Sequence, residues 1–321
     1  MNTYRIAALA LAFACLLQGW TACAVAQATG PCSKEIDHEA DAYGEIISNL
    51  IARVCLWPVV APGESLSDHG TFVFDEDAKV WRRKNVFSPE LMVFRPTFPK
   101  SKTLVLELPG GGYYSQHMGE TPKFGKLALD SGRFFAVLHY RVPRRPGRKI
   151  FDAPREDLQR AVRWLRSRAS EYGWDSEAIG TIGFSAGGHL SVISAVSSQD
   201  KLYGPVDATD ALSPHLNFAV AVYPAYLLDD GSTDPNRNRG DGAALLPEFK
   251  FDKKTPPMLL VHGDDDCYSP MGSVRIYEEL HRRKVPAQMM IYSGASHGLN
   301  ENINVRDWRR SIFGWIESAG Y

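Results

Sequence analysis

The sequence predicts an α/β fold with an open, mostly parallel sheet and helices on both faces. Short runs rich in β-branched and aromatic residues alternate with longer amphipathic segments, the order that a parallel sheet with crossover helices requires. Most of these runs are apolar throughout, as strands covered on both faces are. The chain of 321 residues is 44% hydrophobic and 23% charged, which is typical of a folded protein and excludes disorder, collagen and coiled coil.

The predicted strands and helices follow one another through most of the chain. The strands are Leu91–Phe94, Thr103–Leu108, Phe134–Tyr140, Ile179–Phe184, Phe218–Tyr223, Met258–His262 and Gln288–Tyr292. The clearest helix is Arg155–Tyr172, where apolar residues recur at three- and four-residue steps. Similar patterns predict helices at Ala186–Val196, Gly272–Lys284 and Val305–Glu317. The polar, turn-rich stretch Asp229–Gly242 predicts an exposed loop, either a solvated insertion or a lid over a cleft.

The N-terminus has the features of an export signal. Arg5 precedes the apolar run Ile6–Leu17, and a small-x-small cleavage site ends at Ala26. The apolar run is shorter than the ~20 residues that span a bilayer, which disfavours a membrane anchor. Lipidation at Cys23 is the weaker alternative, because Trp20 stands where a large aliphatic residue is expected. We predict a signal peptide at 1–26, an N-terminal extension packed on the body at 27–90 and one domain at 91–321, with export to the periplasm or secretion.

The cysteines fit an exported protein. Signal cleavage would remove Cys15 and Cys23 and leave three. In an oxidising compartment this odd count favours one disulfide and one free thiol. We predict that Cys32 pairs with Cys55, which would tie the mature N-terminus to the body, and that Cys267 stays unpaired.

The charge balance argues against a nucleic-acid partner. With 36 basic and 37 acidic residues, the net charge of −1 lacks the basic excess that nucleic-acid binding requires, so nucleic acid is not an expected partner. The arginine-rich segments Arg141–Lys149 and Arg306–Arg310 are interpreted as solvated faces. No HExxH motif or clustered Cys/His spacing is present, so we expect no metal site.

The motif Gly183-Phe184-Ser185-Ala186-Gly187 carries the strongest chemical signal. A predicted strand leads into it and a predicted helix leads out, so Ser185 would lie on a tight, strained turn that exposes its hydroxyl at the sheet edge. Glycines two residues to either side of Ser185 leave room for this turn. We therefore predict Ser185 as a nucleophile, which needs an imidazole to take its proton and a carboxylate to orient that imidazole.

The base and the acid are expected downstream of the serine, in the order Ser, Asp, His. His297 lies in a small-residue loop after the last predicted strand, where it can reach over the sheet edge, whereas His189 and His262 are interpreted as core histidines. Three adjacent aspartates follow the strand Met258–His262, namely Asp264, Asp265 and Asp266. We choose Asp266, because the first two are better placed to shape the turn, but spacing alone does not separate the three.

A glycine-rich loop supplies the remaining element of acyl-transfer chemistry. Pro109-Gly110-Gly111-Gly112-Tyr113 follows the strand Thr103–Leu108, where the donors of an oxyanion hole are expected. We predict the amides of Gly111, Gly112 and Ala186 as those donors. A phosphate loop is the rival interpretation, but no GxxxxGK[ST] pattern is present.

These motifs together resemble the α/β-hydrolase superfamily, in particular its acetylxylan-esterase-like branch. The resemblance runs from about Met92 to the C-terminus and includes PGGGYY (109–114), AVLHYRVP (136–143), DLQRAVRWLR (157–166), GFSAGGHL (183–190) and AVYPAY (221–226). It implies Ser185 as nucleophile, Asp266 as acid and His297 as base. Pro109 stands where many relatives of the broader lipase group have histidine. Residues 27 to about 90 show no such resemblance.

The catalytic pattern and the export signal together predict an exported serine esterase that works through an acyl-enzyme without a cofactor. The resemblance implies its substrates, which are acyl and above all acetyl esters of carbohydrates or small molecules. Tyr113 and Tyr114 are the predicted substrate-binding side chains, and Tyr223 and Tyr226 could also offer aromatic surfaces to sugar rings. The alternatives are a general carboxylesterase or lipase, a serine peptidase of the same fold, and a non-catalytic binding protein.

Overall fold

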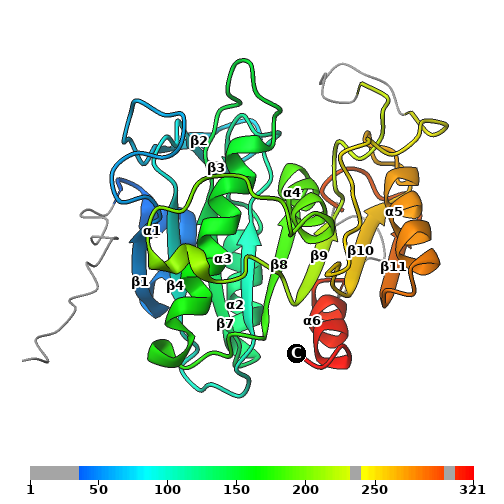
Figure 1. Cartoon of the computed structure of the whole chain (residues 1–321). Helices are drawn as coiled ribbons and strands as arrows, with labels where there is room; N and C mark the ends of the chain where they lie inside the picture. The colour runs from blue at the N-terminus through cyan, green and yellow to red at the C-terminus, as the bar shows by residue number, and fades with distance from the viewer. Residues whose placement is uncertain (1–35, 232–239, 300–307) are drawn as a thin grey trace, which may run out of the picture.

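The computed structural model describes residues 36–231, 240–299 and 308–321 (Figure 1). Its main element is an eight-stranded sheet in the order β1-β4-β7-β5-β8-β9-β10-β11. The strands are β1 (Leu50–Cys55), β4 (Glu90–Phe94), β5 (Leu104–Leu108), β7 (Phe134–His139), β8 (Ile179–Phe184), β9 (Phe218–Val222), β10 (Met258–Gly263) and β11 (Ala287–Tyr292). Seven of them match the predicted strands to within about a residue at each end.

The sheet is parallel over most of its width. Strands β7, β5, β8, β9, β10 and β11 pair in parallel, whereas β4 runs antiparallel to both β7 and β1 at one edge. Strands β4, β5, β7, β8, β9 and β10 are buried throughout, which explains their continuous apolar runs. The predicted fold class is therefore confirmed, with an antiparallel edge added.

Helices cover both faces of the sheet (Figure 1). Helices α3 (Asp152–Tyr172), α4 (Ala186–Val196) and α5 (Met271–Arg282) pack on one face, and α1 (Glu39–Tyr43), α2 (Thr121–Asp130) and α6 (Trp308–Ser318) pack on the other. Helix α3 ends as its sequence predicts, because Gly173 adopts φ +101° and donates its amide to Ala169 O at 2.9 Å. No helix of the described segments is long and apolar enough to cross a membrane.

The described part of the N-terminal segment, from residue 36 onward, contributes a strand to the main sheet. After α1 and the 3-10 helix η1 (Gly44–Asn49), strand β1 extends the main sheet by pairing with β4. A second, three-stranded sheet consists of β2 (Thr71–Asp75), β3 (Val80–Lys84) and β6 (Gln116–His117). The proposed boundaries at residues 26 and 90 stay predictions, and the predicted signal peptide lies outside the described residues.

Only one of the two cysteines of the predicted disulfide lies within the described residues. Cys55, at the end of β1, is disulfide-bonded. Its predicted partner, Cys32, lies outside those residues, so the pairing stays a prediction. Cys267 is a free, exposed cysteine.

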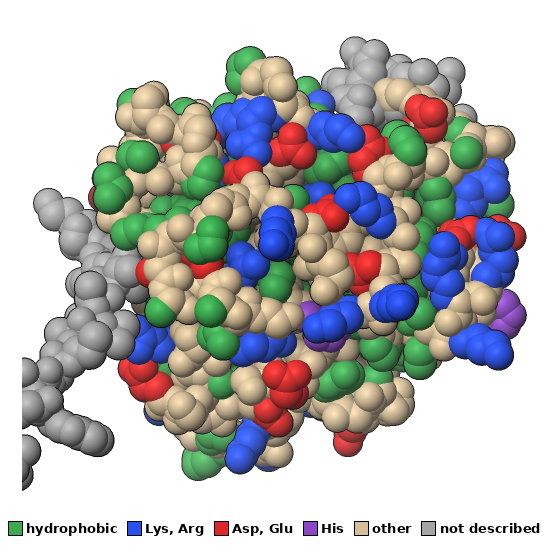
Figure 2. All heavy atoms as spheres, in the orientation of Figure 1, with side chains coloured by type: hydrophobic (Ala, Val, Ile, Leu, Met, Phe, Trp, Pro, Cys, Tyr) green, Lys and Arg blue, Asp and Glu red, His purple; other side chains and the backbone are tan. Residues whose placement is uncertain are grey.

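One of the arginines that were expected at the surface is buried in the structure. On the face drawn in Figure 2, basic side chains are interspersed with acidic ones. Arg141, predicted to lie on a solvated face, is instead fully buried, and this expectation is wrong. Its guanidinium bonds to Asp157 at 2.9 Å and to Glu156 at 2.6 Å, because a buried arginine requires paired carboxylates.

Candidate active site

Ser185 lies at a sharp turn between β8 and α4. Its φ of +53° and ψ of −116° form a conformation that L-residues rarely adopt, as expected for an exposed nucleophile at a strand-to-helix turn. The flanking glycines make this turn sterically possible. A Cβ at Gly183 would lie 2.1 Å from Gly187 O, and a Cβ at Gly187 would lie 1.9 Å from Leu108 O.

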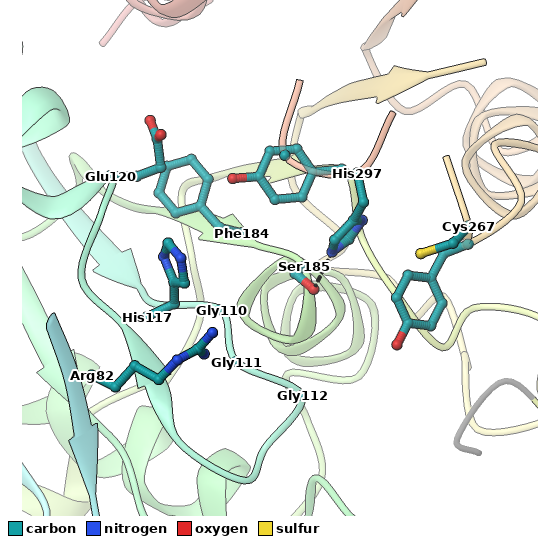
Figure 3. A pocket seen from close by; sticks show the side chains of 13 residues that line it. Arg82, Gly110, Gly111, Gly112, His117, Glu120, Phe184, Ser185, Cys267 and His297 are labelled. Carbon is teal, nitrogen blue, oxygen red and sulfur yellow. Dashed lines mark hydrogen bonds between the residues drawn. The ribbon is translucent and has the colours of Figure 1, made fainter. Parts of the chain in front are cut away.

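A continuous chain of hydrogen bonds connects Ser185 with His297 and Asp266. Figure 3 shows the contact between Ser185 and His297. His297 Nε2 lies 2.8 Å from Ser185 Oγ, and His297 Nδ1 lies 2.9 Å from both carboxylate oxygens of Asp266. With its proton on Nδ1, the imidazole donates to the carboxylate and accepts from the serine hydroxyl. The rings of Tyr223 and Tyr268 pack against His297 with centroid separations of 5.1 Å, which fixes the orientation of the imidazole.

Asp266 is fully buried and remains ionised. The Tyr268 amide donates to its Oδ1 at 2.8 Å, and His262 Nε2 lies 3.4 Å from its Oδ2. Burial by itself raises the pKa of a carboxyl, but the hydrogen bonds from His262 and His297 hold the pKa of Asp266 well below its usual range. The carboxylate can therefore orient His297 and stabilise it when the ring becomes cationic.

The two neighbouring aspartates have a different arrangement. Asp264 Oδ1 accepts the amide of Gly294, whereas Asp265 is exposed and donates its own amide to Ala295 O at 3.1 Å. Both residues thereby connect the loop after β10 to the loop that carries His297. Only Asp266, of the three candidates left open by spacing, contacts the imidazole.

The histidines interpreted as core residues are buried as predicted. His189 accepts the hydroxyl of Tyr113 on Nδ1 at 2.8 Å, and burial lowers the pKa of His189 to about 3, so its ring is neutral. His262 accepts the Ser273 hydroxyl on Nδ1 at 2.8 Å. Its contact with Asp266 was not predicted, because no motif in the sequence distinguishes a buried histidine from one that supports a triad acid.

The glycine-rich loop lies directly against the nucleophile turn. A Cβ at Gly110 would approach Phe184 O to 2.9 Å and Ser185 Cβ to 3.2 Å. Gly111 and Gly112 adopt φ of +122° and +65° and line the same pocket as Ser185. Close approach and positive φ explain why glycines occupy this loop. Its placement beside Ser185 is the one that the oxyanion-hole prediction requires.

The two tyrosines predicted to contact substrate lie in different environments. Tyr113 is fully buried and hydrogen-bonded to His189, so the expectation that its side chain binds substrate is wrong. Its phenol instead supports the glycine-rich loop from inside. Tyr114 is 51% exposed, and the Arg144 guanidinium lies 4.1 Å above its ring. Arg144 also donates to Gly112 O at 3.0 Å, which braces the loop.

An open pocket of about 440 Å³ surrounds the serine hydroxyl, within the ~300–1,000 Å³ typical of small-molecule sites (Figure 3). Sequence reasoning did not associate several of its residues with the site, notably Arg82, His117 and Glu120. The lining residues are Arg82, Gly110, Gly111, Gly112, His117, Glu120, Phe184, Ser185, Tyr223, Cys267, Tyr268, His297 and Gly298. Part of the predicted loop Asp229–Gly242, residues 232–239, lies outside the described residues.

A group of potential metal ligands coincides with this site. Atoms of Asp266, Cys267 and His297 lie within 4.8 Å of one another. Both carboxylate oxygens of Asp266 are hydrogen-bonded to His297, and the second nitrogen of that ring contacts Ser185. The hydrogen-bonded chain thus accounts for the proximity of these groups.

Comparisons with known proteins agree with the fold. A family model described as BD-FAE matches residues 91–229. Esterase LipC of Mycobacterium tuberculosis is 25% identical over 244 residues, which cover 69% of this chain and 56% of LipC. An acetylxylan esterase of Xylanibacter ruminicola is 26% identical over 227 residues, which cover 65% of this chain and 43% of that protein. The matched part of the chain thus spans less than two thirds of the length of these curated relatives.

Solved structures are similar over most of the described chain. The crystal structure of an acetyl ester-xyloside bifunctional hydrolase from Caldicellulosiruptor lactoaceticus has a TM-score of 0.59 and 25% identity, covering 80% of this chain and 99% of that one. Esterase 2 of Thermogutta terrifontis has a TM-score of 0.60 at 21% identity, covering 79% and 96%, and supports the fold. The chain therefore has the α/β-hydrolase fold. It is similar to curated esterases, and these include an acetylxylan esterase.

Proposed function

We propose that this protein hydrolyses short acyl esters, in particular acetyl esters of carbohydrates, with Ser185 as nucleophile, His297 as general base and acid, and Asp266 as the orienting carboxylate. The observation that carries the proposal is the unbroken hydrogen-bonded chain from Ser185 Oγ through His297 to Asp266 at the wall of an open pocket. It provides each proton-transfer partner that a serine hydroxyl needs to attack a carbonyl.

The reaction has two stages. Ser185 Oγ attacks the ester carbonyl while its proton moves to His297 Nε2, and the oxyanion accepts hydrogen bonds from the amides of Gly111, Gly112 and Ala186. The tetrahedral intermediate collapses as His297 returns the proton to the leaving alcohol, leaving an acyl-enzyme. Water, deprotonated by His297, then attacks the acyl-enzyme, and release of the carboxylic acid restores Ser185. This chemistry needs no cofactor.

Two findings support a preference for acetylated carbohydrates. The similar proteins include one named acetylxylan esterase and one described as an acetyl ester-xyloside hydrolase. The pocket also offers hydrogen-bonding groups beside its aromatic walls, which suits a polyhydroxylated alcohol better than a long acyl chain.

A substrate panel tests the proposal. Purified protein would be assayed on acetylated xylan, 4-nitrophenyl acetate, long-chain 4-nitrophenyl esters and peptide anilides, with Ser185→Ala as the blank. We expect hydrolysis of the acetyl esters and loss of roughly 10⁴-fold or more in kcat for Ser185→Ala. Preference for long acyl chains would indicate a lipase, and preference for anilides a peptidase. Either preference would overturn the substrate assignment.

We also propose export with removal of residues 1–26 and a Cys32–Cys55 disulfide in the mature chain. The charged, apolar and small-residue segments of the N-terminus support cleavage. Expression of the full chain in a bacterial host, followed by non-reducing peptide mass spectrometry of the envelope and medium fractions, tests both points. A chain that stays in the cytoplasm and still begins with Met1 would contradict export. Carboxymethylation of Cys32 by an alkylating reagent, without prior reduction, would contradict the pairing.

A further inference from the structure

A polar surface faces the catalytic serine across the pocket. Arg82 of β3 and His117 of β6 are directly opposed in the antiparallel register of the small sheet, so their side chains share one face of that sheet. Both line the pocket that contains Ser185. Figure 3 shows the Arg82 guanidinium pointing toward the loop that carries Gly111, with His117 beside it.

The orientation of Arg82 is fixed from outside the pocket. Its Nε donates to Asp75 Oδ2 at 2.6 Å, and Asp75 is not a pocket-lining residue. The side chain keeps 25% of its surface exposed. The next residue, Arg83, is fully buried on the opposite face of the strand and bonds to Glu90 at 2.7 Å. Strand alternation therefore directs one arginine to the core and the other to the site.

The acidic residue of the pocket does not cancel this positive charge. Glu120 accepts two hydrogen bonds from the Arg309 guanidinium, at 2.9 and 3.0 Å. Burial and the nearby Arg82 charge lower the pKa of His117, so His117 is neutral at pH 7. Its Nδ1 accepts the amide of Gly119 at 3.3 Å, which leaves Nε2 as a donor. Arg82 is paired with Asp75 through Nε, so this wall offers a substrate the remaining guanidinium nitrogens of Arg82 and a donor from His117.

We propose that Arg82 and His117 form a subsite for a carboxylate carried by the ester substrate, either on the alcohol, as in an acidic sugar, or on the acyl group, as in the half-ester of a dicarboxylic acid. A guanidinium can donate two parallel hydrogen bonds to the two oxygens of a carboxylate, and the imidazole adds a further donor. Both residues come from the small sheet, and Arg82 precedes the BD-FAE match at 91–229. The inference rests on the proposed esterase function.

Two matched substrate pairs test the subsite and locate the carboxylate. Acetylated methyl glucuronoside and acetylated methyl glucoside differ on the alcohol side, and 4-nitrophenyl hydrogen succinate and 4-nitrophenyl butyrate differ on the acyl side. We expect the protein to favour the charged member of one pair through a lower KM. Arg82→Gln should reduce kcat/KM for that member by about tenfold or more, the size of a lost charge-assisted hydrogen bond, while the neutral member stays within about twofold.

Arg168→Gln is the matched control, because Arg168 lies on α3, is 37% exposed and pairs with Glu171 rather than the pocket. An equal effect of Arg82→Gln on both members of each pair, or no charged preference in the unmodified protein, would refute the subsite. Even if the subsite were refuted, loss of activity in Ser185→Ala would still support the proposed esterase function. Persistence of activity in Ser185→Ala would refute the esterase itself.

Inhibition of the unmodified protein decides the question if Arg82→Gln does not fold. We expect glucuronate or succinate to compete with 4-nitrophenyl acetate, methyl glucoside to compete less, and the inhibition constant of the anion to rise with ionic strength. Equal inhibition by glucuronate and methyl glucoside, with no competition by succinate, would overturn the proposal.

Discussion

At the scale of single residues, the three aspartates after β10 show how position decides chemistry. Asp264 and Asp265 connect two loops, while Asp266 is buried against His297 and His262. The sequence reasoning that assigned the first two to the turn leads to the same choice, but turn chemistry alone could not establish it. The contact between Asp266 and His297 depends on two loops that are distant in sequence and adjacent only in the folded sheet.

Asp266→Asn should reduce kcat by about 10⁴-fold with little change in KM, because the amide stabilises the wrong tautomer of His297. Asp265→Asn is the matched control, because Asp265 is exposed. Steady-state kinetics on 4-nitrophenyl acetate checks both variants. Comparable losses in the two variants would mean that the acid has been assigned incorrectly.

The ionisation of Asp266 predicts the shape of the pH profile. Because the pKa of Asp266 is held well below its usual range, this carboxyl stays charged as the pH falls through the range in which an imidazole is protonated. Only the base is then lost, so log kcat/KM should fall with a slope of one on the acid side. A slope approaching two above about pH 4 would show that Asp266 titrates together with the base.

At the scale of elements, the nucleophile turn depends on close packing between α4 and the end of β5. Gly187→Ala should destabilise the protein by about 3 kcal/mol or prevent folding, since the new methyl would lie 1.9 Å from Leu108 O. Gly204→Ala is the control, as no atom lies within 4 Å of a Cβ built there. Chemical denaturation of both variants checks this, and a Gly187→Ala protein of unchanged stability would contradict the packing described.

The glycine-rich loop is supported by the hydrogen bond between Tyr113 and His189. Tyr113→Phe keeps the ring and removes the hydroxyl that His189 accepts at 2.8 Å. We expect kcat to fall about fivefold with KM nearly constant, because the oxyanion donors are realigned while binding is retained. Tyr172→Phe, at the C-terminal end of α3, is the control. A change confined to KM would place Tyr113 in binding rather than in support of the loop.

Sequence patterns predicted the elements of the main sheet better than those of the small sheet. Strands β5, β7, β8, β9 and β10 are buried throughout, and burial leaves a continuous apolar signal. Strand β3 has the sequence VWRRK and β6 has only two residues, so neither shows the alternation of apolar and polar residues that predicts a strand. Their pairing joins residues far apart in sequence. Arg82 and His117 were missed as pocket residues for this reason.

At the scale of the whole molecule, a buried acid couples stability to pH. Glu107 on β5 accepts the Thr121 hydroxyl, and burial raises the pKa of Glu107 to about 8. The native state therefore keeps a proton that the unfolded chain releases near its ordinary pKa of 4.5. The free energy of unfolding contributed by this group is highest below pH 4.5 and declines as the pH rises to about 8.

Replacement of this acid should flatten the pH dependence of stability. Between about pH 5.5 and pH 8, Glu107→Gln should lose less stability than the unmodified protein, by on the order of 3 kcal/mol. Urea denaturation at the two pH values measures the difference, with Glu76→Gln as a control at a side chain that is 76% exposed. Equal pH dependence in all three proteins would show that Glu107 is ionised in the folded state.

The most direct test of the account is covalent labelling of the nucleophile. Treatment with a fluorophosphonate, followed by intact-protein and peptide mass spectrometry, should give one adduct per chain on Ser185, and Ser185→Ala should give none. His297→Gln should label far more slowly, since the hydroxyl then has no base. An unlabelled Ser185, or an adduct that forms equally fast without His297, would contradict the central claim that these residues act as one catalytic unit.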